Sequence, residues 1–290
     1  MNITLSDIRH NQYGFKALVN MISKTDDCFG DDIYIDMGKT SWFDADMCAA
    51  FGAILYQLGK KLNTIRLTNI QTDVKIILSK NGFLSHYGQE KIPDCWGTTI
   101  PYQRFDVKED RYFANYIENK LIRRHEIPTM SQGLLKRFRE SIFEIFSNAV
   151  LHSHTKMGIF SCGQFFPRQH QLNFSVADLG IGIRRNIKDN IGLILSAEAA
   201  IQWATEGRNT TKRGPVPGGL GLKLLGEFID LNRGCIQIVS DAGYWKRENK
   251  KTYTASLAHP FPGTVVTVEI NTADANSYRL ASELSTADIF

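Results

Sequence analysis

The most informative stretch of the sequence is Glu144-Ile145-Phe146-Ser147-Asn148-Ala149. Two glycine-containing segments follow it along the chain, and their order relative to this stretch indicates the fold. These segments are Asp178-Leu179-Gly180-Ile181-Gly182 and Gly218-Gly219-Leu220-Gly221-Leu222. Each of the three alone is a weak signal, since such short sequences are common in loops and on helix surfaces. Their order and spacing are those that one nucleotide pocket needs, so together they predict a nucleotide-binding domain in the second half of the chain.

The first segment is predicted to lie on a helix that runs from about Gln132 to His152. Glu144, Asn148 and His152 recur on this helix every four residues and form a polar stripe that can point into a site. An amide oxygen is a hard ligand that suits Mg²⁺, and a carboxylate one turn away can orient or deprotonate an attacking water. Taken in isolation, the same stripe would be the solvated face of an amphipathic helix.

The second segment follows a predicted strand that runs from Gln171 to Asp178. Apolar and polar residues alternate along this strand, so Asp178 lies at its end, where the chain turns through Gly180 and Gly182. A buried carboxylate suits adenine because it accepts a hydrogen bond from the exocyclic amine. The two glycines allow the backbone to approach a base and a ribose closely. We therefore expect these residues in a base-binding site, although a lone sequence of this kind is usually an ordinary loop.

The third segment, Gly219-Leu220-Gly221-Leu222, is predicted to open a helix. Free backbone N–H groups at a helix N-terminus bind phosphate well. The residues before it mix glycine, threonine and proline with basic side chains, and we expect Lys212 among them to contact a terminal phosphate. The alternative interpretation of this stretch is an exposed basic loop.

Together the three segments resemble the N box, G1 box and G2 box of the GHKL superfamily of ATPases, which contains gyrase, the heat-shock chaperone ATPase, the histidine kinases and MutL. The resemblance covers about residues 130–270. It implies that Asn148 holds Mg²⁺, that Glu144 acts as general base and that Asp178 contacts the adenine amino group. The implied ligands are therefore ATP and Mg²⁺.

The same resemblance implies roles for further residues. His152 matches the N box, and the loop around Lys212 corresponds to the ATP lid, which closes over the triphosphate. The turn from Gly219 to Leu222 would hold phosphates. A Gly-Thr pair often opens the last strand in this superfamily, so Thr264 is expected to support the adenine through a water molecule.

The first half of the chain contains IYIDMGKTSWFDADMCAAFGAIL followed by IRLTNIQTDVKIILSKNGF, and its pattern predicts a β-α-β-α module. Over residues 30–90 the order of elements resembles a STAS domain, the fold of anti-sigma-factor antagonists. Such domains usually carry Asp-Ser-Ser-Gly where this chain has Asp44-Ala45-Asp46-Met47, so regulated serine phosphorylation is not expected. Asp46 is either a permanent negative charge near a helix start, which the helix dipole favours, or an ordinary helix N-terminal residue.

These observations predict an α/β (α+β) chain in three parts. Residues 1–100 form a STAS-like regulatory or interaction domain, residues 106–272 a Bergerat-type ATP-binding domain, and residues 273–290 a tail. The second domain is expected to be an α/β sandwich with a mixed, largely antiparallel sheet on one side and helices on the other. The stretch from Lys91 to Asp110 is the expected junction, and Tyr244-Trp245-Lys246-Arg247 is expected in a surface loop between two strands.

The composition argues against several classes of function. A formal net charge of +4 over 290 residues is too small to indicate nucleic acid as a partner. The five cysteines are scattered without a CxxC pair, so we expect free thiols in a reducing cytoplasm rather than a zinc site or disulfides. No apolar run approaches the roughly 18 residues of a membrane-spanning helix, and no signal peptide is recognisable. The expected protein is cytoplasmic and does not enter a membrane.

The expected function is binding of Mg-ATP with slow hydrolysis, used as a conformational switch that regulates a protein partner. That partner could be a STAS-like or other regulatory protein, and a homodimer is a further option. One alternative is an anti-sigma-type serine protein kinase that acts on a separate STAS-like protein, since the same glutamate and asparagine serve both reactions. Another is a non-catalytic nucleotide-binding interaction module. The presence of Glu144 favours a catalytic protein, because a pure binder needs no base.

Overall fold

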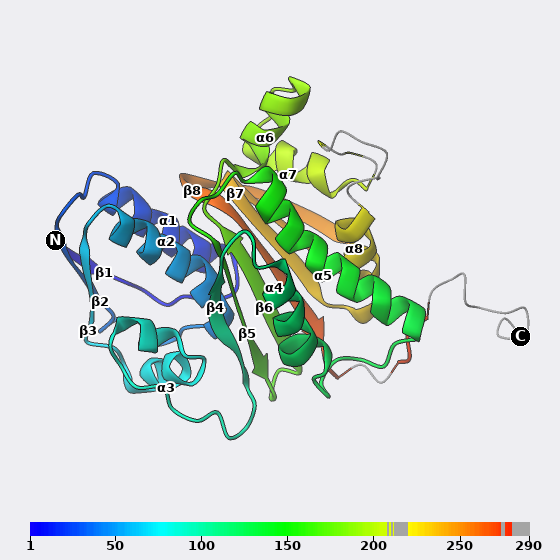
Figure 1. Ribbon diagram of the computed structural model, residues 1–290, viewed down its shortest axis with the longest axis horizontal. Coiled ribbons are helices and arrows are strands. Elements are labelled where there is room, and N and C mark those ends of the chain that lie inside the picture. The colour runs from blue at the N-terminus through cyan, green and yellow to red at the C-terminus, as the bar shows by residue number, and fades with distance from the viewer. Residues whose placement is uncertain (208, 210, 212–219, 274–275, 280–290) are drawn as a thin grey trace, which may run out of the picture.

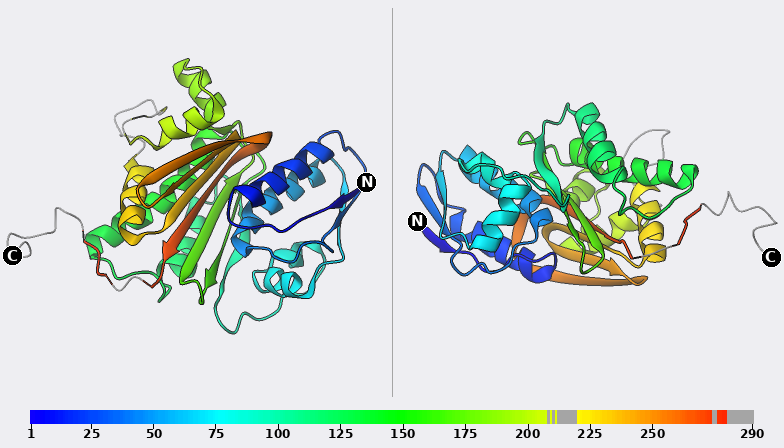
Figure 2. Two further views of the ribbon diagram at one scale, coloured as in Figure 1. Left: turned by 180° about the vertical axis from the view of Figure 1, so that it is seen from behind. Right: turned by 90° about the horizontal axis from the view of Figure 1, so that it is seen from below.

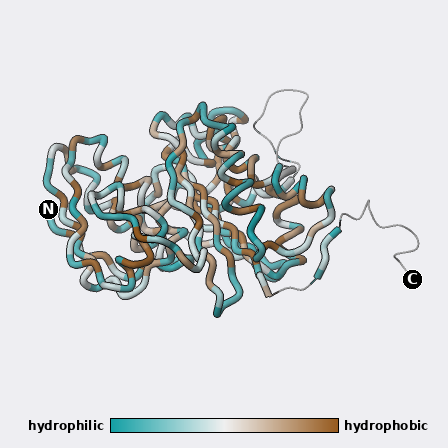
Figure 3. The backbone as a smooth tube through the Cα atoms, turned by 60° about the horizontal axis from the view of Figure 1, so that its bottom comes forward, coloured by the Kyte–Doolittle hydropathy of each residue, from teal (hydrophilic) through white to brown (hydrophobic). Residues whose placement is uncertain are grey.

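The computed structural model describes residues 1–207, 209, 211, 220–273 and 276–279. The described elements form an α/β architecture, as the sequence predicts. A three-stranded sheet, a pair of helices, a five-stranded sheet and a second set of helices are stacked on one another (Figure 1). Hydrophobic residues recur along the strands and helices in the body of the molecule (Figure 3).

The N-terminal part of the chain consists of three β-α units whose strands pair in parallel in the order β1-β2-β3. The strands are β1 (Asn2–Thr4), β2 (Asp32–Asp36) and β3 (Thr64–Thr68), and the helices are α1 (Gln12–Thr25), α2 (Cys48–Lys60) and α3 (Thr72–Lys80). The sequence pattern predicts the elements from β2 to α3 but misses β1 and α1. The start of α1 nevertheless carries a local signal, since the Asn11 side chain caps it by accepting hydrogen bonds from the N–H groups of Tyr13 and Gly14.

The second sheet has five described strands in the order β4-β5-β6-β8-β7. They are β4 (Thr99–Phe105), β5 (Ile159–Phe166), β6 (Gln171–Asp178), β7 (Cys235–Glu248) and β8 (Lys251–Asn271). Every pairing among them is antiparallel, so the expected parallel component of a mixed sheet is absent from the described strands. Short turns join β5 to β6 and β7 to β8, and a short turn permits only antiparallel pairing.

One expectation about a loop is wrong, and a second stretch contains an element that the sequence did not reveal. The stretch from Lys91 to Asp110, expected as a junction, contains strand β4 at the edge of the five-stranded sheet. Tyr244 and Trp245, expected on a surface loop, lie within β7 and are 1 % and 2 % exposed. The cause is a long β7–β8 hairpin that packs on α7 (Ala197–Thr205), where Trp245 Nε1 donates a 2.8 Å hydrogen bond to Gln202.

Strand β6 is buried on both faces, and each face belongs to a different half of the chain. Leu172, Phe174 and Val176 pack in the core beneath the C-terminal helices. Ser175 and Ala177 lie on the opposite face, which α1 and α2 cover (Figure 2). The described helices of the C-terminal half pack on one face of this sheet, as expected, and the other face is covered by helices from the N-terminal half, which the sequence did not predict. The N-terminal half supplies the second helical layer.

The outer layer of helices contains the longest described helix, α5, which has the limits that the sequence predicts. Helix α5 runs from Gln132 to His152. The other members of this layer are α4 (Asp110–Ile117), the π-helical turn η3 (Glu118–Ile122), α6 (Gly182–Ile191) and α8 (Leu220–Asn232). Ser131 caps α5 by accepting a 3.2 Å hydrogen bond from the N–H of Leu134, and Phe146 stacks on Phe113 of α4 at 4.3 Å. None of the described helices has the length and apolar character needed to cross a bilayer.

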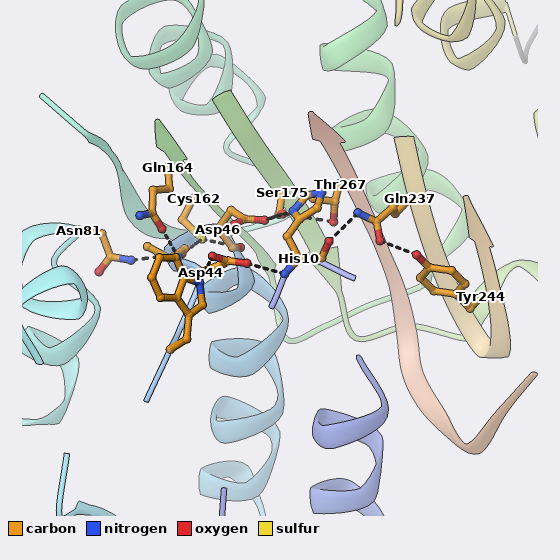
Figure 4. A network of polar contacts seen from close by, with 12 residues as sticks. His10, Asp44, Asp46, Asn81, Cys162, Gln164, Ser175, Gln237, Tyr244 and Thr267 are labelled. Carbon is orange, nitrogen blue, oxygen red and sulfur yellow. Dashed lines mark hydrogen bonds and ion pairs between the residues drawn. The ribbon is translucent and has the colours of Figure 1, made fainter. Parts of the chain in front are cut away.

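A buried polar network joins the N-terminal half to the five-stranded sheet (Figure 4). His10 Nδ1 lies 2.6 Å from Asp46 Oδ2, which also accepts a 3.1 Å hydrogen bond from Ser175 Oγ on β6. The His10 N–H donates a 2.6 Å hydrogen bond to Asp44. Burial alone would lower the pKa of His10, but the negative charge of Asp46 and the other carboxylates outweighs burial, and the pKa is raised. The two halves are thus joined through a buried ion pair.

Asp46 does not present a charge to solvent. It lies in the 3₁₀ turn η1 (Ala45–Met47) directly before α2, and its side chain is fully buried. Both alternatives drawn from the sequence placed it near a helix start, which is correct, but neither anticipated a histidine partner from a loop that precedes α1.

We expect His10→Ala to lower the free energy of unfolding by about 3–5 kcal/mol, because it leaves the Asp46 carboxylate buried without its cationic partner. The double change His10→Ala/Asp46→Ala should cost less than the sum of the two single changes. Urea unfolding of the four proteins measures the coupling. Asp26→Asn is the control, since Asp26 pairs with Lys61 at the surface and should change the stability by less than about 0.5 kcal/mol.

The effect of His10→Ala should also depend on pH. The folded-state pKa of His10 lies above its unfolded value of 6.5, so its stabilising contribution is present below that value and is lost as pH rises through the folded pKa. The destabilisation should therefore be larger at about pH 6 than at about pH 9. A strictly additive double change, with equal losses at both pH values, would contradict an ion pair at this position.

Candidate functional site

A cavity between α5, the end of β6, the middle of β8, and the helices α6 and α7 is lined by half of the sequence-predicted site residues. Its empty space is about 950 Å³, counting the part that is open to solvent, which is within the range of small-molecule sites. The predicted residues that line it are Asn148, His152, Asp178, Gly182, Leu222 and Thr264. Residues from four separate stretches of the sequence therefore meet in one place.

The other predicted residues have different positions. Glu144 is half-buried on α5, one turn before Asn148, and does not itself line the cavity. Leu220 and Gly221 form the first turn of α8, whose next residue reaches the cavity. Lys212 and Gly219 lie outside the described residues.

Asp178 is the most unusual group in the cavity. It ends β6, is 4 % exposed, and is the direct cross-strand neighbour of Thr264 on β8. Its Oδ1 atom is buried and has no hydrogen-bond partner among the described residues. Burial raises the pKa of Asp178 from 3.8 to about 8, although backbone hydrogen bonds from Thr264 and Gly180 oppose the shift. A buried acceptor without a partner is costly, and in a cavity wall it is placed where it could accept a hydrogen bond from a ligand donor.

Gly182 and Thr264 meet at a polar corner beside Asp178. Ser240 Oγ lies 3.0 Å from Thr264 Oγ1 and accepts a 2.9 Å hydrogen bond from the N–H of Ile183. Gly182 has a φ of 72°, a conformation that favours glycine, and a Cβ there would lie 3.1 Å from Ser240 Oγ. The glycine therefore lets the first turn of α6 lie against the middle of β8, which brings both elements to the cavity.

Gly180 has a packing role that the sequence did not reveal. A Cβ at this position would overlap the carbonyl oxygen of Ser153 at the end of α5, and the next residue, Ile181, donates a 2.8 Å hydrogen bond to that oxygen. Gly180 is not among the residues that line the cavity. It fixes the turn after β6 against α5, and this contact sets the position of the cavity wall.

His152 lies at the end of α5 and is held by residues that the sequence did not single out. Its carbonyl oxygen accepts a 3.1 Å hydrogen bond from Asn186 on α6, and its Nδ1 lies 3.3 Å from Thr211 Oγ1. Asn186 and Thr211 also line the cavity. Helix α6 was missed because its glycines indicate a loop, yet Ile183 and Ile187 at helical spacing were a usable signal.

Most of the remaining wall of the cavity is apolar, and Ser153 and Asn209 are its further polar residues. The apolar side chains include Ile145, Ala149, Val176, Ile183, Ile187, Trp203, Leu222, Ile238 and Val266. None of the described lining residues is lysine or arginine. An apolar slot with one buried carboxylate suits a flat heterocycle with an amino group, and it does not suit a phosphate group.

A metal ion at this site would depend on few protein ligands. Among the residues that the structure describes, no three His, Cys, Asp or Glu side chains are grouped so as to hold a metal ion. Asn148 supplies an amide oxygen at the cavity, and Mg²⁺ commonly takes only one or two protein ligands beside phosphate oxygens and water. The residues present are therefore compatible with Mg²⁺ brought in by a nucleotide, but not with a metal site made of protein alone.

No protein-family model matches the chain, and no curated protein is significantly similar to it. The interpretation of the site therefore rests on its own residues and geometry.

We expect Asp178→Asn to stabilise the protein above neutral pH. The raised folded-state pKa means that stability is greatest below the unfolded value of 3.8 and is lost as pH rises through about 8. The amide removes this loss, so the gain should grow from near zero at about pH 4 to on the order of 6 kcal/mol at about pH 9, at roughly 1.4 kcal/mol per pKa unit. Thermal unfolding across this pH range measures it.

Asp27→Asn, a change of the same kind at an exposed carboxylate, is the matched control and should leave the pH dependence unchanged. If Asp178→Asn behaved like the control, Asp178 would be an ordinary ionised residue without the strain that a ligand site implies.

Proposed function

We propose that this chain binds Mg-ATP through the cavity around Asp178 and hydrolyses it slowly, as a switch that regulates a protein partner. The observation that carries the proposal is the buried Asp178 Oδ1, which lacks a hydrogen-bond partner among the described residues and lines a cavity that has no lysine, arginine or other carboxylate among its described lining residues. The exocyclic amine of adenine is a donor of the required kind. Thr264, directly opposite Asp178 in the sheet, would support the same ring through a water molecule.

The phosphates would extend from this slot toward the first turn of α8. Leu222, the third residue of α8, lines the cavity, and the N-terminal end of a helix favours anions. Lys212, which the resemblance assigns to a phosphate, lies outside the described residues and would contribute a positive charge to the triphosphate. Asn148 would hold Mg²⁺, and Glu144, one turn earlier on the same helix, would orient or deprotonate the attacking water. Magnesium would supply charge neutralisation at the phosphate oxygens.

In this proposal the five-stranded sheet and its outer helices are a Bergerat-type domain of the GHKL superfamily. The support is the position of the three sequence segments, which reach one cavity from α5, from the turn after β6 and from the start of α8. The N-terminal half would be a STAS-like module. Its support is the regular alternation of three strands and three helices, together with the resemblance of residues 30–90.

The regulatory part of the proposal concerns the two faces of β6. Asp178 contributes to the cavity, and Ser175, three residues earlier, donates to Asp46 of the N-terminal half. Ligand binding that stabilises β6 should therefore also stabilise the packing of α1 and α2. Amide hydrogen exchange with and without Mg-ATP measures this coupling, and the expected result is slower exchange in β6, α1 and α2 together. Protection confined to β6 would contradict it.

The central test compares ATP binding and phosphate release in the native protein, Asp178→Asn and Glu144→Ala. Above about pH 8, where Asp178 is ionised, Asp178→Asn should weaken ATP binding at least tenfold, because an amide is a poorer acceptor for the adenine amine than a carboxylate. Glu144→Ala should retain binding and lower phosphate release by about 10²–10⁴-fold, the range for loss of a general base. Glu140→Ala is the matched control, since Glu140 is a carboxylate one turn earlier on α5 that pairs with Arg137 at the surface.

The outcomes separate the alternatives. Binding without phosphate release, combined with transfer of labelled phosphate to a serine of a second protein, would replace the ATPase with an anti-sigma-type kinase. Binding without either reaction would leave a non-catalytic nucleotide-binding module. Failure of the native protein to bind ATP would overturn the proposal as a whole.

A further inference from the structure

A second cavity opens where the two halves of the chain meet at β4. The end of α3, the loop of residues 91–99, β4 and η3 line it, and its empty space is about 1020 Å³, counting the part open to solvent. It shares no lining residue with the cavity around Asp178. A ligand here would contact the N-terminal and C-terminal halves at once, without reaching the proposed nucleotide site.

The lining of this second cavity is strongly cationic. Its charged side chains are Lys80, Lys91, Lys120, Arg124 and a single carboxylate, Asp94. None of the three lysines forms an ion pair within the part of the chain that the structure describes. Cations gathered in a concave surface focus the electrostatic potential and attract anions.

Asp94, the single carboxylate of the cavity, forms no ion pair with these lysines among the described residues. Asp94 accepts hydrogen bonds from the Thr99 N–H at 2.7 Å, from Thr99 Oγ1 at 2.8 Å and from Thr98 Oγ1 at 3.2 Å. Burial opposes its charge, but these hydrogen bonds outweigh burial and lower the pKa of Asp94. Asp94 is therefore committed to the structure of its own loop.

Arg124 holds the same loop from the other side. Its guanidinium group donates to the carbonyl oxygens of Gly97 and Thr99 and forms a 2.7 Å hydrogen bond with Glu126. The wall between Asp94 and Thr99 is therefore fixed by hydrogen bonds before any ligand arrives. Because Glu126 offsets the charge of Arg124, the excess positive charge of the cavity comes from the three lysines.

The lysines come from three separate segments that packing brings together. Lys80 ends α3, and Lys120 belongs to η3. Lys91 lies over Gly82, directly after α3, since a Cβ at Gly82 would be 3.5 Å from Lys91 Cε and 3.6 Å from Lys91 Nζ. Two of the ammonium groups thus approach the cavity from the N-terminal half and one from the C-terminal half.

An exposed aromatic ring stands in the same loop. Trp96 lies between Asp94 and Gly97 in the turn closed by the Gly97 N–H bond to the Asp94 carbonyl, and it is 83 % exposed. A tryptophan this exposed has little role in stabilising the fold. Beside a cationic cavity, an exposed indole offers a stacking surface for a nucleobase.

We propose that this cavity binds a small ligand that carries a diphosphate group. The diphosphate is held by Lys80, Lys91 and Lys120, and Trp96 stacks on the base when the ligand is a nucleotide. Two or three lysines around one anion match the charge of a diphosphate better than that of a single carboxylate or phosphate. The proposal does not depend on ATP binding at Asp178.

Isothermal titration of the full chain with inorganic pyrophosphate tests the phosphate part. Lys91→Ala and Lys120→Ala should each weaken binding about tenfold, the usual effect of losing one charged hydrogen bond. Lys75→Ala is the matched control, because Lys75 is an exposed lysine on α3 outside the cavity, and it should leave the affinity unchanged. Circular dichroism of each variant shows whether the fold is retained.

Titration with ADP, carried out on Asp178→Asn to weaken the first cavity, distinguishes the source of the diphosphate. Binding of ADP that is tighter than that of pyrophosphate, and that Trp96→Ala reduces to the pyrophosphate level, supports a nucleotide. Equal binding of both ligands with no effect of Trp96→Ala supports inorganic pyrophosphate or another simple diphosphate.

Three results would overturn the proposal. The first is the absence of pyrophosphate binding by the native protein. The second is an equal loss of affinity in Lys75→Ala and Lys91→Ala, which indicates unspecific attraction to surface charge. The third is far tighter binding of a single-stranded oligonucleotide than of either small ligand, with a steep dependence on salt, which indicates a nucleic-acid surface instead.

Discussion

The register between β6 and β8 is the constraint on which the rest of the structure depends, because β6 is buried on both faces. This register places Asp178 opposite Thr264 and Ser175 opposite Thr267. In a strand, a shift of one residue exchanges the faces of all its side chains. Such a shift would move Asp178 out of the cavity and Ser175 away from Asp46. One pairing therefore sets both the candidate site and the contact with the N-terminal half.

Two buried carboxylates on opposite sides of this sheet show how environment separates structure from function. Asp46 has a cationic partner in His10 and a donor in Ser175, so its charge is compensated within the protein. Asp178 has no lysine or arginine beside it among the described residues that line the cavity. An unpartnered oxygen does not distinguish the two carboxylates, since Oδ1 of Asp46 and Oδ1 of Asp178 both lack a hydrogen-bond partner among the described residues. The difference lies in the neighbouring cation: a carboxylate with such a partner can specify how segments pack, whereas one without it costs stability when it ionises.

The sequence predicted those parts of the molecule that have strong local signals. Helix α5 and strand β6 have the predicted limits, because long periodic patterns and a serine cap mark them. Asp178, at the end of β6, and Asn148 and His152, on α5, line one cavity, and the sequence could predict this because both elements have strong local signals. Helix α6, Asn186 and Trp203 were not anticipated, since they reach the cavity only through tertiary packing. The lysine-lined cavity has no sequence signal at all, because its three lysines come from segments that are distant along the chain.

The shared core also limits where a conformational change can take place. Residues of α1 and α2 pack with residues of β5, β6 and β8 in one hydrophobic cluster, and the His10–Asp46 pair is buried within the same contact. Separating the halves would expose this apolar surface together with two charges, so the halves should stay joined in any ligand state. The C-terminal end of α6 is packed differently. Ile191, which ends α6, and Ile194, which follows it, are 42 % and 85 % exposed, whereas Ile187 of the same helix is buried and lines the cavity. A response to a ligand is therefore expected in α6, while the sheet and the N-terminal half move as one body.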